Sequence, residues 1–137
     1  MEIRTARAPG DIAKAVAIDK AHIGTNERSD YITSVAERGG LSIVVTEGGV
    51  QAFSCLDHGY FFGKPFISLL IVAPVASRQG FGTELLLHSS DTFPEVWTST
   101  NRSNEPMRRL LSKAGWRYCG EVSGLDEGDP EHFFASV

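Results

Sequence analysis

Residues 72–83 read VAPVASRQGFGT, and this stretch decides the fold. An apolar run at residues 66–73 ends at Pro74, a polar turn follows, and helical periodicity extends over residues 80–90. The length and continuity of the apolar run are typical of a central strand that is buried on both faces. We therefore predict a buried strand, a tight loop and a helix that begins at residue 80.

The start of that helix is a candidate anion site. Backbone N–H groups in the first turn of a helix have no partner within the helix, and the helix dipole favours a negative charge there. Gly80 and Gly82 carry no side chains where a pyrophosphate group would approach the backbone, and Arg78 adds a positive charge. The same glycines also suit tight packing of a helix on a strand, and the spacing alone favours neither interpretation.

Upstream of this stretch, the hydrophobic pattern changes from helical periodicity to strand periodicity. We expect a strand near residue 3, helices at residues 12–21 and 31–36, and strands at residues 41–47 and 50–56. Asp11 is a candidate N-cap for the first helix, and Gly39 ends the second. Gly48 and Gly49 predict a two-residue hairpin turn.

Downstream, Pro106 suits the first turn of another helix, and apolar residues recur from Met107 at helical spacing. We expect a strand at residues 96–99 before this helix and strands at residues 116–122 and 132–137 after it. The whole order is β-α-α-β-β-β-α-β-α-β-β. It predicts a single α/β (α+β) domain over residues 1–137 with a mixed, mostly antiparallel sheet.

Composition sets limits on the function. The chain has 137 residues, of which 42% are apolar, and a net charge of −4, so we expect no nucleic-acid partner. The longest apolar stretch is too short to span a bilayer and the N-terminus lacks the apolar segment of a signal peptide, so we expect a cytoplasmic protein without a membrane partner. Cys55 and Cys119 are interpreted as reduced thiols. No Cys or His pair has metal-ligand spacing, so no metal is expected.

Two motifs have a spacing that matters together. Val72-Ala73-Pro74 ends the central strand and is followed by Ser77-Arg78-Gln79-Gly80-Phe81-Gly82. A second motif begins at an asparagine and continues at positions +3, +7, +11 and +12: Asn104, Met107, Leu111, Gly115 and Trp116. Both motifs resemble the CoA-binding signatures of the GNAT family of N-acetyltransferases. The order of the elements and the acidic segment at residues 125–131 are also similar to members of that family, so the resemblance covers nearly the whole chain.

The resemblance implies a binding site for acetyl-CoA as cosubstrate. The strands at residues 66–73 and 96–100 would separate to admit the pantetheine arm, and a backbone N–H at Val72 would polarise the acetyl carbonyl. The residues implied to contact the cofactor are Ile71, Val72 and Ala73 for pantetheine, Arg78, Gln79, Gly80, Phe81, Gly82 and Thr83 for pyrophosphate, and Asn104, Met107 and Leu111 on the following helix. The alternative for Asn104 is that its only role is to cap its helix.

The sequence departs from the family pattern at two positions. Ser77 stands where the family has Arg or Gln, which predicts weaker binding of CoA. Leu111 stands where many members have a Tyr that protonates the departing thiolate. Leu111 has no proton to give, so water or Tyr118 would have to do so. Because general acid catalysis contributes about 10²–10⁴-fold, we expect a modest kcat.

The general base is not evident from the sequence. Family members often use a carboxylate on the central strand, but here that strand offers only Ser68 among apolar residues. His58, with Asp57 beside it, is the first candidate because histidine titrates near neutral pH. The alternative is that His58 is a solvated loop residue.

The expected function is direct transfer of an acetyl group from acetyl-CoA to a primary amine in a ternary complex. The alternative is a non-catalytic sensor or regulatory module that binds CoA or acyl-CoA. A small-molecule amine is the expected acceptor, and the chain is expected to be a monomer or homodimer. The acidic residues at 126–131 are either a solvated turn or an electronegative rim that attracts a cationic amine.

Overall fold

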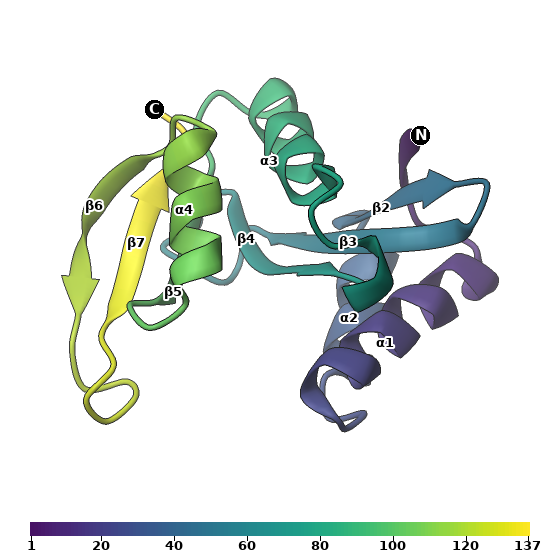
Figure 1. Ribbon diagram of the computed structural model, residues 1–137, viewed down its shortest axis with the longest axis horizontal. Helices are drawn as coiled ribbons and strands as arrows, with labels where there is room; N and C mark the ends of the chain where they lie inside the picture. The colour runs from purple at the N-terminus through teal and green to yellow at the C-terminus, as the bar shows by residue number, and fades with distance from the viewer.

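A computed structural model describes all residues from 1 to 137. The predicted order of elements is confirmed, with one additional short 3-10 turn before the third helix (Figure 1). The elements are β1 (Glu2–Thr5), α1 (Pro9–Ile23), α2 (Ser29–Glu37), β2 (Leu41–Thr46), β3 (Gly49–Asp57), β4 (Phe66–Val72), η1 (Pro74–Ala76), α3 (Phe81–Thr92), β5 (Trp97–Asn101), α4 (Glu105–Lys113), β6 (Arg117–Val122) and β7 (Glu131–Ala135).

The seven strands form one sheet in the order β1-β2-β3-β4-β5-β7-β6. Every neighbouring pair is antiparallel except β4 and β5, which are parallel. The prediction of a mixed, mostly antiparallel sheet is therefore confirmed. In Figure 1, β5, β6 and β7 lie to the left with α4, while β2, β3 and β4 extend to the right.

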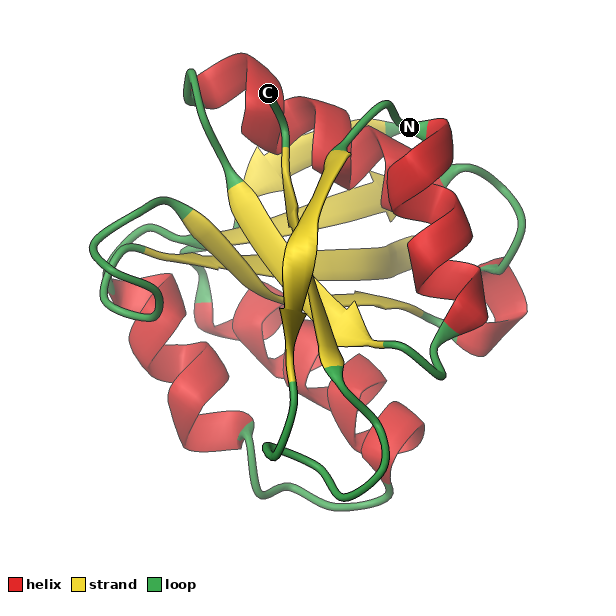
Figure 2. Cartoon of the chain, turned by 90° about the vertical axis from the view of Figure 1, so that its left-hand side faces the viewer, coloured by secondary structure: helices red, strands yellow, loops and turns green.

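Helices cover both faces of the sheet (Figure 2). On one face, α1 and α2 pack against β2 and β3 in a core that includes Ile32, Leu41 and Phe53. On the other face, α3 and α4 pack in cores that include Leu85 and Leu111. These two layers of helices cover both sides of β4, in which Phe66 and Ile67 are buried and residues 68–72 are partly buried, and this explains its nearly continuous apolar sequence.

Several expected boundaries differ from the structure for local reasons. Helix α1 begins at Pro9 rather than residue 12, because proline already has the backbone angle of a first helical residue. Asp11 is therefore not the N-cap; it lies in the first turn and pairs with Arg4 of β1 at 3.1 Å. The hairpin after β2 turns at Glu47 and Gly48, since Gly49 already pairs with Thr46.

Strand β4 contains the irregularity that shapes the centre of the sheet. Leu56 of β3 pairs with Ile67, but Cys55 pairs with Leu69, so Ser68 is an extra residue without a partner on β3. Such a bulge re-aims side chains and interrupts the ladder. Pairing between β4 and β5 is limited to Phe66 with Trp97 and Ile67 with Thr98, so the two strands stop pairing at the bulge.

Candidate functional site

The two central strands separate in the middle of the sheet. Beyond the pair of Ile67 and Thr98, β4 continues to Val72 and β5 to Asn101 without pairing. We call these unpaired parts, residues 68–72 and 99–101, the β4–β5 fork, and the last pair its vertex. The Thr98 hydroxyl donates to the carbonyl of Ile67 at 2.8 Å and fastens the vertex. The separation matches the one that the family resemblance implies.

The register of β3 and β4 determines which backbone groups face the fork. Ala73 N–H donates to the carbonyl of Gln51 at 2.8 Å. Because hydrogen bonds alternate along an antiparallel pair, Ile71 also bonds toward β3, while Leu70 and Val72 direct their N–H and C=O groups toward β5. Val72 thus has the orientation that its expected role needs. Leu70 shares that orientation, and only the strand register could have revealed it.

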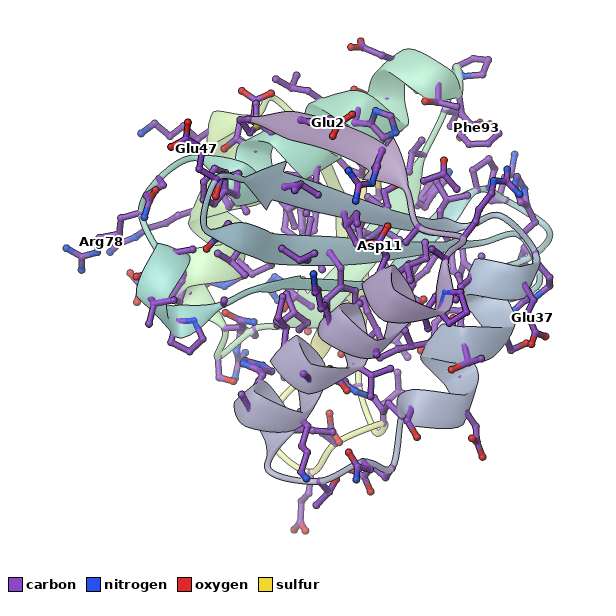
Figure 3. The ribbon with its side chains drawn as sticks, turned by 90° about the vertical axis from the view of Figure 1, so that its right-hand side faces the viewer. Glu2, Asp11, Glu37, Glu47, Arg78 and Phe93 are labelled. Atoms are coloured by element: carbon purple, nitrogen blue, oxygen red, sulfur yellow. The ribbon has the colours of Figure 1, made fainter.

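The far end of the fork leads into the start of α3. Ser77 N–H is bonded to Pro74, but the N–H groups of residues 78 to 83 have no acceptor within the protein, and the first one paired in the helix is that of Glu84, with Gly80 O at 3.1 Å. Arg78 is held at φ 64°, in the left-handed region that non-glycine residues rarely adopt. Figure 3 shows its side chain extending away from the body of the protein, at the opposite end from Phe93. This loop therefore offers a run of free donors and a positive charge to an anion.

The two glycines of the motif have different roles. Gly80 has φ 83°, and it is the N-cap of α3 in the left-handed conformation. Gly82 is needed for packing, because a Cβ atom there would lie 2.8 Å from Leu110 Cδ2. That Cβ would also approach Leu70 and Val72 of β4. The structure thus supports both interpretations of the motif. Gly80 shapes the segment of free N–H groups at residues 78–83, which we call the donor loop, and Gly82 brings α3 close to α4 and β4.

The residues of the second motif serve α4 and its core. Asn104 Oδ1 accepts the N–H of Met107 at 3.2 Å, so Asn104 is the N-cap of α4. Met107 packs at the edge of the core that contains Trp116. Leu111 is completely buried in that core and has no surface to offer to a bound cofactor. Tyr118 lies on β6, separated from β5 by β7, so it is not a neighbour of the fork.

The two candidate catalytic side chains do not act as a pair. The His58 ring packs edge-on against Phe93, the residue that follows α3, with the ring centroids 5.2 Å apart. It lines a hollow of about 350 Å³ over β1, β2 and β3, together with Thr5 and His88. No hydrogen bond joins His58 to Asp57, whose carboxylate binds other groups.

Asp57 is 5% exposed and accepts three hydrogen bonds. Oδ1 accepts from Arg38 Nη1 at 3.1 Å and from the Gly59 N–H at 2.9 Å. Oδ2 accepts from the Tyr31 hydroxyl at 2.7 Å. Burial by itself would raise the pKa of Asp57, but the bonds from Tyr31 and Gly59, together with Arg38, lower it below its ordinary value. Asp57 is therefore ionised near neutral pH.

Tyr31 connects Asp57 to the bulge in β4. Its hydroxyl lies 2.6 Å from Ser68 Oγ in addition to its bond to Asp57. Burial raises the pKa of Tyr31, so the phenol stays neutral. Sequence reasoning named Asp57 and Ser68 individually and Tyr31 only as the end of residues 23–31, a region expected to border the acceptor. It did not foresee the contact, because a residue 37 positions away from Ser68 gives no signal of it.

Aromatic side chains lie near the vertex, on the face of the sheet that Tyr31 covers. The aromatic cluster consists of Tyr60, Phe61, Phe66, Trp97 and Phe133. Phe61 stacks on Phe133 with ring centroids 5.2 Å apart, and its centroid lies 5.5 Å from that of Trp97. The ring centroids of Tyr60 and Tyr31 are 6.4 Å apart, which places the cluster beside the Tyr31 ring.

The acidic loop between β6 and β7 is fastened to the end of β5. Asp129 accepts two hydrogen bonds from Ser103, at 3.0 Å and 2.6 Å, and they lower its pKa. Asp126 accepts from Asn101 at 2.8 Å. Glu131 instead accepts from the Ser99 hydroxyl at 2.7 Å, on β5. Two of the carboxylates therefore hold the loop in place, and Glu131 lies next to the fork.

The overall structure is similar to that of an acetyltransferase of the GNAT family from Bacillus cereus ATCC 10987. The two chains are 34% identical, the match covers 98% of this chain and 95% of the other, and the TM-score is 0.92. The chain belongs to the GNAT family of acetyltransferases. No protein-family model matches it, and no curated protein matches it by sequence.

More distant structures share the fold of this GNAT-family chain. A ribosomal-protein-alanine N-acetyltransferase from Brucella melitensis is 15% identical, with a TM-score of 0.79 and a match over 100% of this chain and 99% of the other. An aminoglycoside 6'-N-acetyltransferase complexed with coenzyme A is 10% identical, with a TM-score of 0.83 and a match over 99% and 96%. No helix of this GNAT domain has the length and apolar character to cross a membrane, and no three His, Cys, Asp or Glu side chains are grouped as metal ligands.

Proposed function

We propose that this GNAT protein transfers the acetyl group of acetyl-CoA to a primary amine, directly and in a ternary complex. The observation that carries the proposal is the continuity between the β4–β5 fork and the free N–H groups of residues 78–83. A pyrophosphate at the start of α3 would have six consecutive donors, from Arg78 to Thr83, and no competing acceptor.

The fork gives the acyl arm a defined path. Val72 and Leu70 direct backbone groups toward it and can bond an extended amide-containing chain as a neighbouring strand would. At about 3.3 Å per residue, β4 extends about 13 Å from Val72 to Ser68. An arm that enters beside Val72 thus brings its thioester toward the vertex. One of the two N–H groups is then placed to stabilise the oxyanion that forms during attack.

The cysteines support direct transfer rather than an acyl-enzyme. Burial raises the pKa of Cys55 to about 12, so its thiolate fraction is negligible near neutral pH. Cys119 lies on β6, at the far edge of the sheet. In direct transfer the amine nitrogen bonds to the acetyl carbon, the C–S bond breaks, and CoA leaves with the electron pair. A thiol pKa of about 8.5 lets the thiolate leave without an acid at the position of Leu111.

The acceptor is the less defined substrate. The aminoglycoside and ribosomal-protein enzymes share this fold while their names state different acceptors, so the fold alone does not select one. We assign this protein a small-molecule primary amine, because the aromatic cluster and Glu131 border the fork. Nothing in the structure favours the alternative of a non-catalytic CoA-binding module.

Two measurements test the proposal. Calorimetric titration with acetyl-CoA and with CoA is expected to give dissociation constants of about micromolar strength, or about −8 kcal/mol. Release of free thiol from acetyl-CoA is then expected to depend on an added amine from a panel of polyamines, amino acids and arylalkylamines. Absence of binding at about millimolar ligand would exclude the cofactor, and binding without amine-dependent turnover would leave a CoA-binding protein that is not a transferase.

A further inference from the structure

Side chains from three elements form a hydrogen-bonded chain that ends at the vertex of the fork. Asp57 ends β3, Tyr31 belongs to α2, and Ser68 is the extra residue of the β4 bulge. Asp57 Oδ2 and Tyr31 Oη are 2.7 Å apart, and Tyr31 Oη and Ser68 Oγ are 2.6 Å apart. The contacts proposed above for acetyl-CoA at the α3 end of the fork involve none of the three side chains.

The hydrogen bonds from Ser68 through Tyr31 to Asp57 run in one direction, because the Asp57 carboxylate can only accept. The Asp57 carboxylate is held ionised by Arg38 and Gly59 on its other oxygen. The single proton of the Tyr31 hydroxyl is therefore donated to Asp57. Tyr31 Oη must then accept, so the Ser68 hydroxyl donates to it rather than to the Cys55 carbonyl, which lies 3.5 Å away.

This direction leaves Ser68 Oγ as an acceptor only. Its proton is committed to Tyr31, and its lone pairs remain for a third partner. Ser68 is also the first residue of β4 beyond the last pair with β5. Its oxygen therefore lies near the vertex, where a thioester whose carbonyl is held by the Leu70 N–H would meet an acceptor in the function proposed above.

We propose that Ser68 binds the acceptor amine by accepting one of its N–H groups, and that Tyr31 and Asp57 are positioning residues that fix the direction of the Ser68 hydroxyl. This inference rests on the proposed acetyl transfer and names the group that orients the attacking nitrogen. The ammonium form of the amine first loses a proton to water, because it has no lone pair. With an N–H of the neutral amine directed to Ser68, the nitrogen lone pair is free to face the acetyl carbon.

The contact strengthens as the reaction proceeds. When the C–N bond forms, the nitrogen becomes cationic and its N–H groups become stronger donors, so the bond to Ser68 Oγ is stronger in the transition state than in the ground state. The C–S bond then breaks with its electron pair on CoA, and the surplus proton of the nitrogen passes to water. Asp57 receives no proton in this scheme, since its three hydrogen bonds favour the carboxylate.

A second hydroxyl of the same kind lies on the other arm of the fork. Ser99 of β5 donates its proton to Glu131 Oε2 at 2.7 Å, so its oxygen also keeps its lone pairs. Ser99 lies two residues after Trp97 on β5, so the two side chains point to the same face of the sheet. That face carries the aromatic cluster and Tyr31. Two such acceptors suit a nitrogen that carries two N–H groups in addition to its lone pair. The substrate class is therefore a primary rather than a secondary amine.

The test compares Ser68→Ala, Tyr31→Phe and Asp57→Asn with two matched controls. Asp57→Asn keeps the shape of the side chain but replaces Oδ2 with a donor, which reverses the chain and turns the Ser68 hydroxyl toward the amine. Asp30→Asn, on the exposed side of α2, and Tyr118→Phe, on β6, change the same chemical groups away from the fork. The probes are acetyl-CoA with phenethylamine, and N-methylphenethylamine as the secondary amine.

We expect kcat/KM for phenethylamine to fall about 10- to 100-fold in Ser68→Ala and Asp57→Asn, and about 10-fold in Tyr31→Phe. The KM for acetyl-CoA is expected to stay within about 2-fold of the wild type in all three, and Ser68→Thr, which keeps the hydroxyl, to recover most of the rate. The pH profile of Asp57→Asn is expected to keep its shape, since Asp57 is not the base. A merely structural role would instead lower the melting temperature and affect both substrates alike.

The inference is overturned if Ser68→Ala and Asp57→Asn keep the amine kcat/KM of the two controls. Loss of the low-pH limb of the pH profile in Asp57→Asn would also overturn it, because the ionised Asp57 would then be the base that accepts the proton. If the wild type acetylates no amine, the proposed function is wrong, and calorimetry of phenethylamine with the CoA-saturated protein decides the inference. Binding that Ser68→Ala abolishes supports it, and equal or absent binding in both proteins refutes it.

Discussion

The two ends of the β4–β5 fork are built in different ways. The α3 end consists of backbone donors from one continuous segment, residues 78–83. The vertex end consists of side chains brought from residues 31, 57 and 68 by three elements. The first kind of site depends on local conformation, so it appears as a motif in the sequence. The second depends on packing of separate elements, so no motif in the sequence reveals it.

The largest expected effect is at the α3 end. Gly80→Pro forces φ near −65° at a residue that has φ 83° and removes its N–H. We expect the affinity for CoA to fall about 100-fold or more, because the donor loop can no longer keep its shape. Calorimetry measures the loss. Gly124→Pro, at another left-handed glycine in the β6–β7 loop, is the control and is expected to lower stability while CoA still binds normally.

A second substitution asks whether one family residue can be restored on α4. Leu111→Tyr places a phenol where the family often has one, but Leu111 is fully buried among core side chains. We expect a loss of about 1–3 kcal/mol in unfolding free energy from overpacking and no gain in kcat. Chemical denaturation and steady-state kinetics check both. A clear rise in kcat would show that the core rearranges and that the phenol reaches the thiolate.

A smaller effect is expected from the exposed charge of the donor loop. Arg78→Ala removes a positive side chain that Figure 3 shows extending into solvent. We expect CoA to bind about 3- to 10-fold more weakly at low salt, with the difference shrinking at high salt because exposed charges are screened. Titration at two ionic strengths measures this, with Lys14→Ala on α1 as the control. An effect on the KM for the amine alone would contradict this prediction, because Arg78 would then act on the amine rather than on CoA.

The smallest effect concerns the stability of the vertex end at acidic pH. The pKa of Asp57 is lowered in the folded protein, so its ionised form stabilises the fold above the unfolded value of 3.8. This contribution is lost as the pH falls through the folded pKa. The unfolding free energy of the wild type is therefore expected to approach that of Asp57→Asn below about pH 4. A constant difference between the two proteins across that range would mean that Asp57 keeps its ordinary pKa.

Most of the fold could be predicted from the sequence. Hydrophobic periodicity located every helix and strand, and the motif at residues 72–83 located the loop at the start of α3. The errors were local: Pro9 began α1 early, and the turn after β2 lay one residue before Gly49. In each case a single backbone preference decided the boundary, and periodicity does not register such a preference.

Less of the candidate site could be predicted. Asp57 and His58 are adjacent in sequence, and sequence reasoning paired them, but the structure gives Asp57 to Tyr31 and Arg38 and leaves His58 against Phe93. Adjacent residues at the end of a strand leave it in different directions. Neighbours in sequence are thus poor guides to partners at the end of a strand.

The sequence by itself determined the order of the elements and the donor loop, because both follow from the conformational preferences of successive residues. Only the tertiary structure decided which N–H groups of β4 face the fork and which hydroxyl lies at its vertex. The physical reason is the bulge at Ser68: one unpaired residue shifts the register of β3 and β4 and sets which side chains and backbone groups beyond it face the fork. Packing of α2 on that face then brings Tyr31 to it.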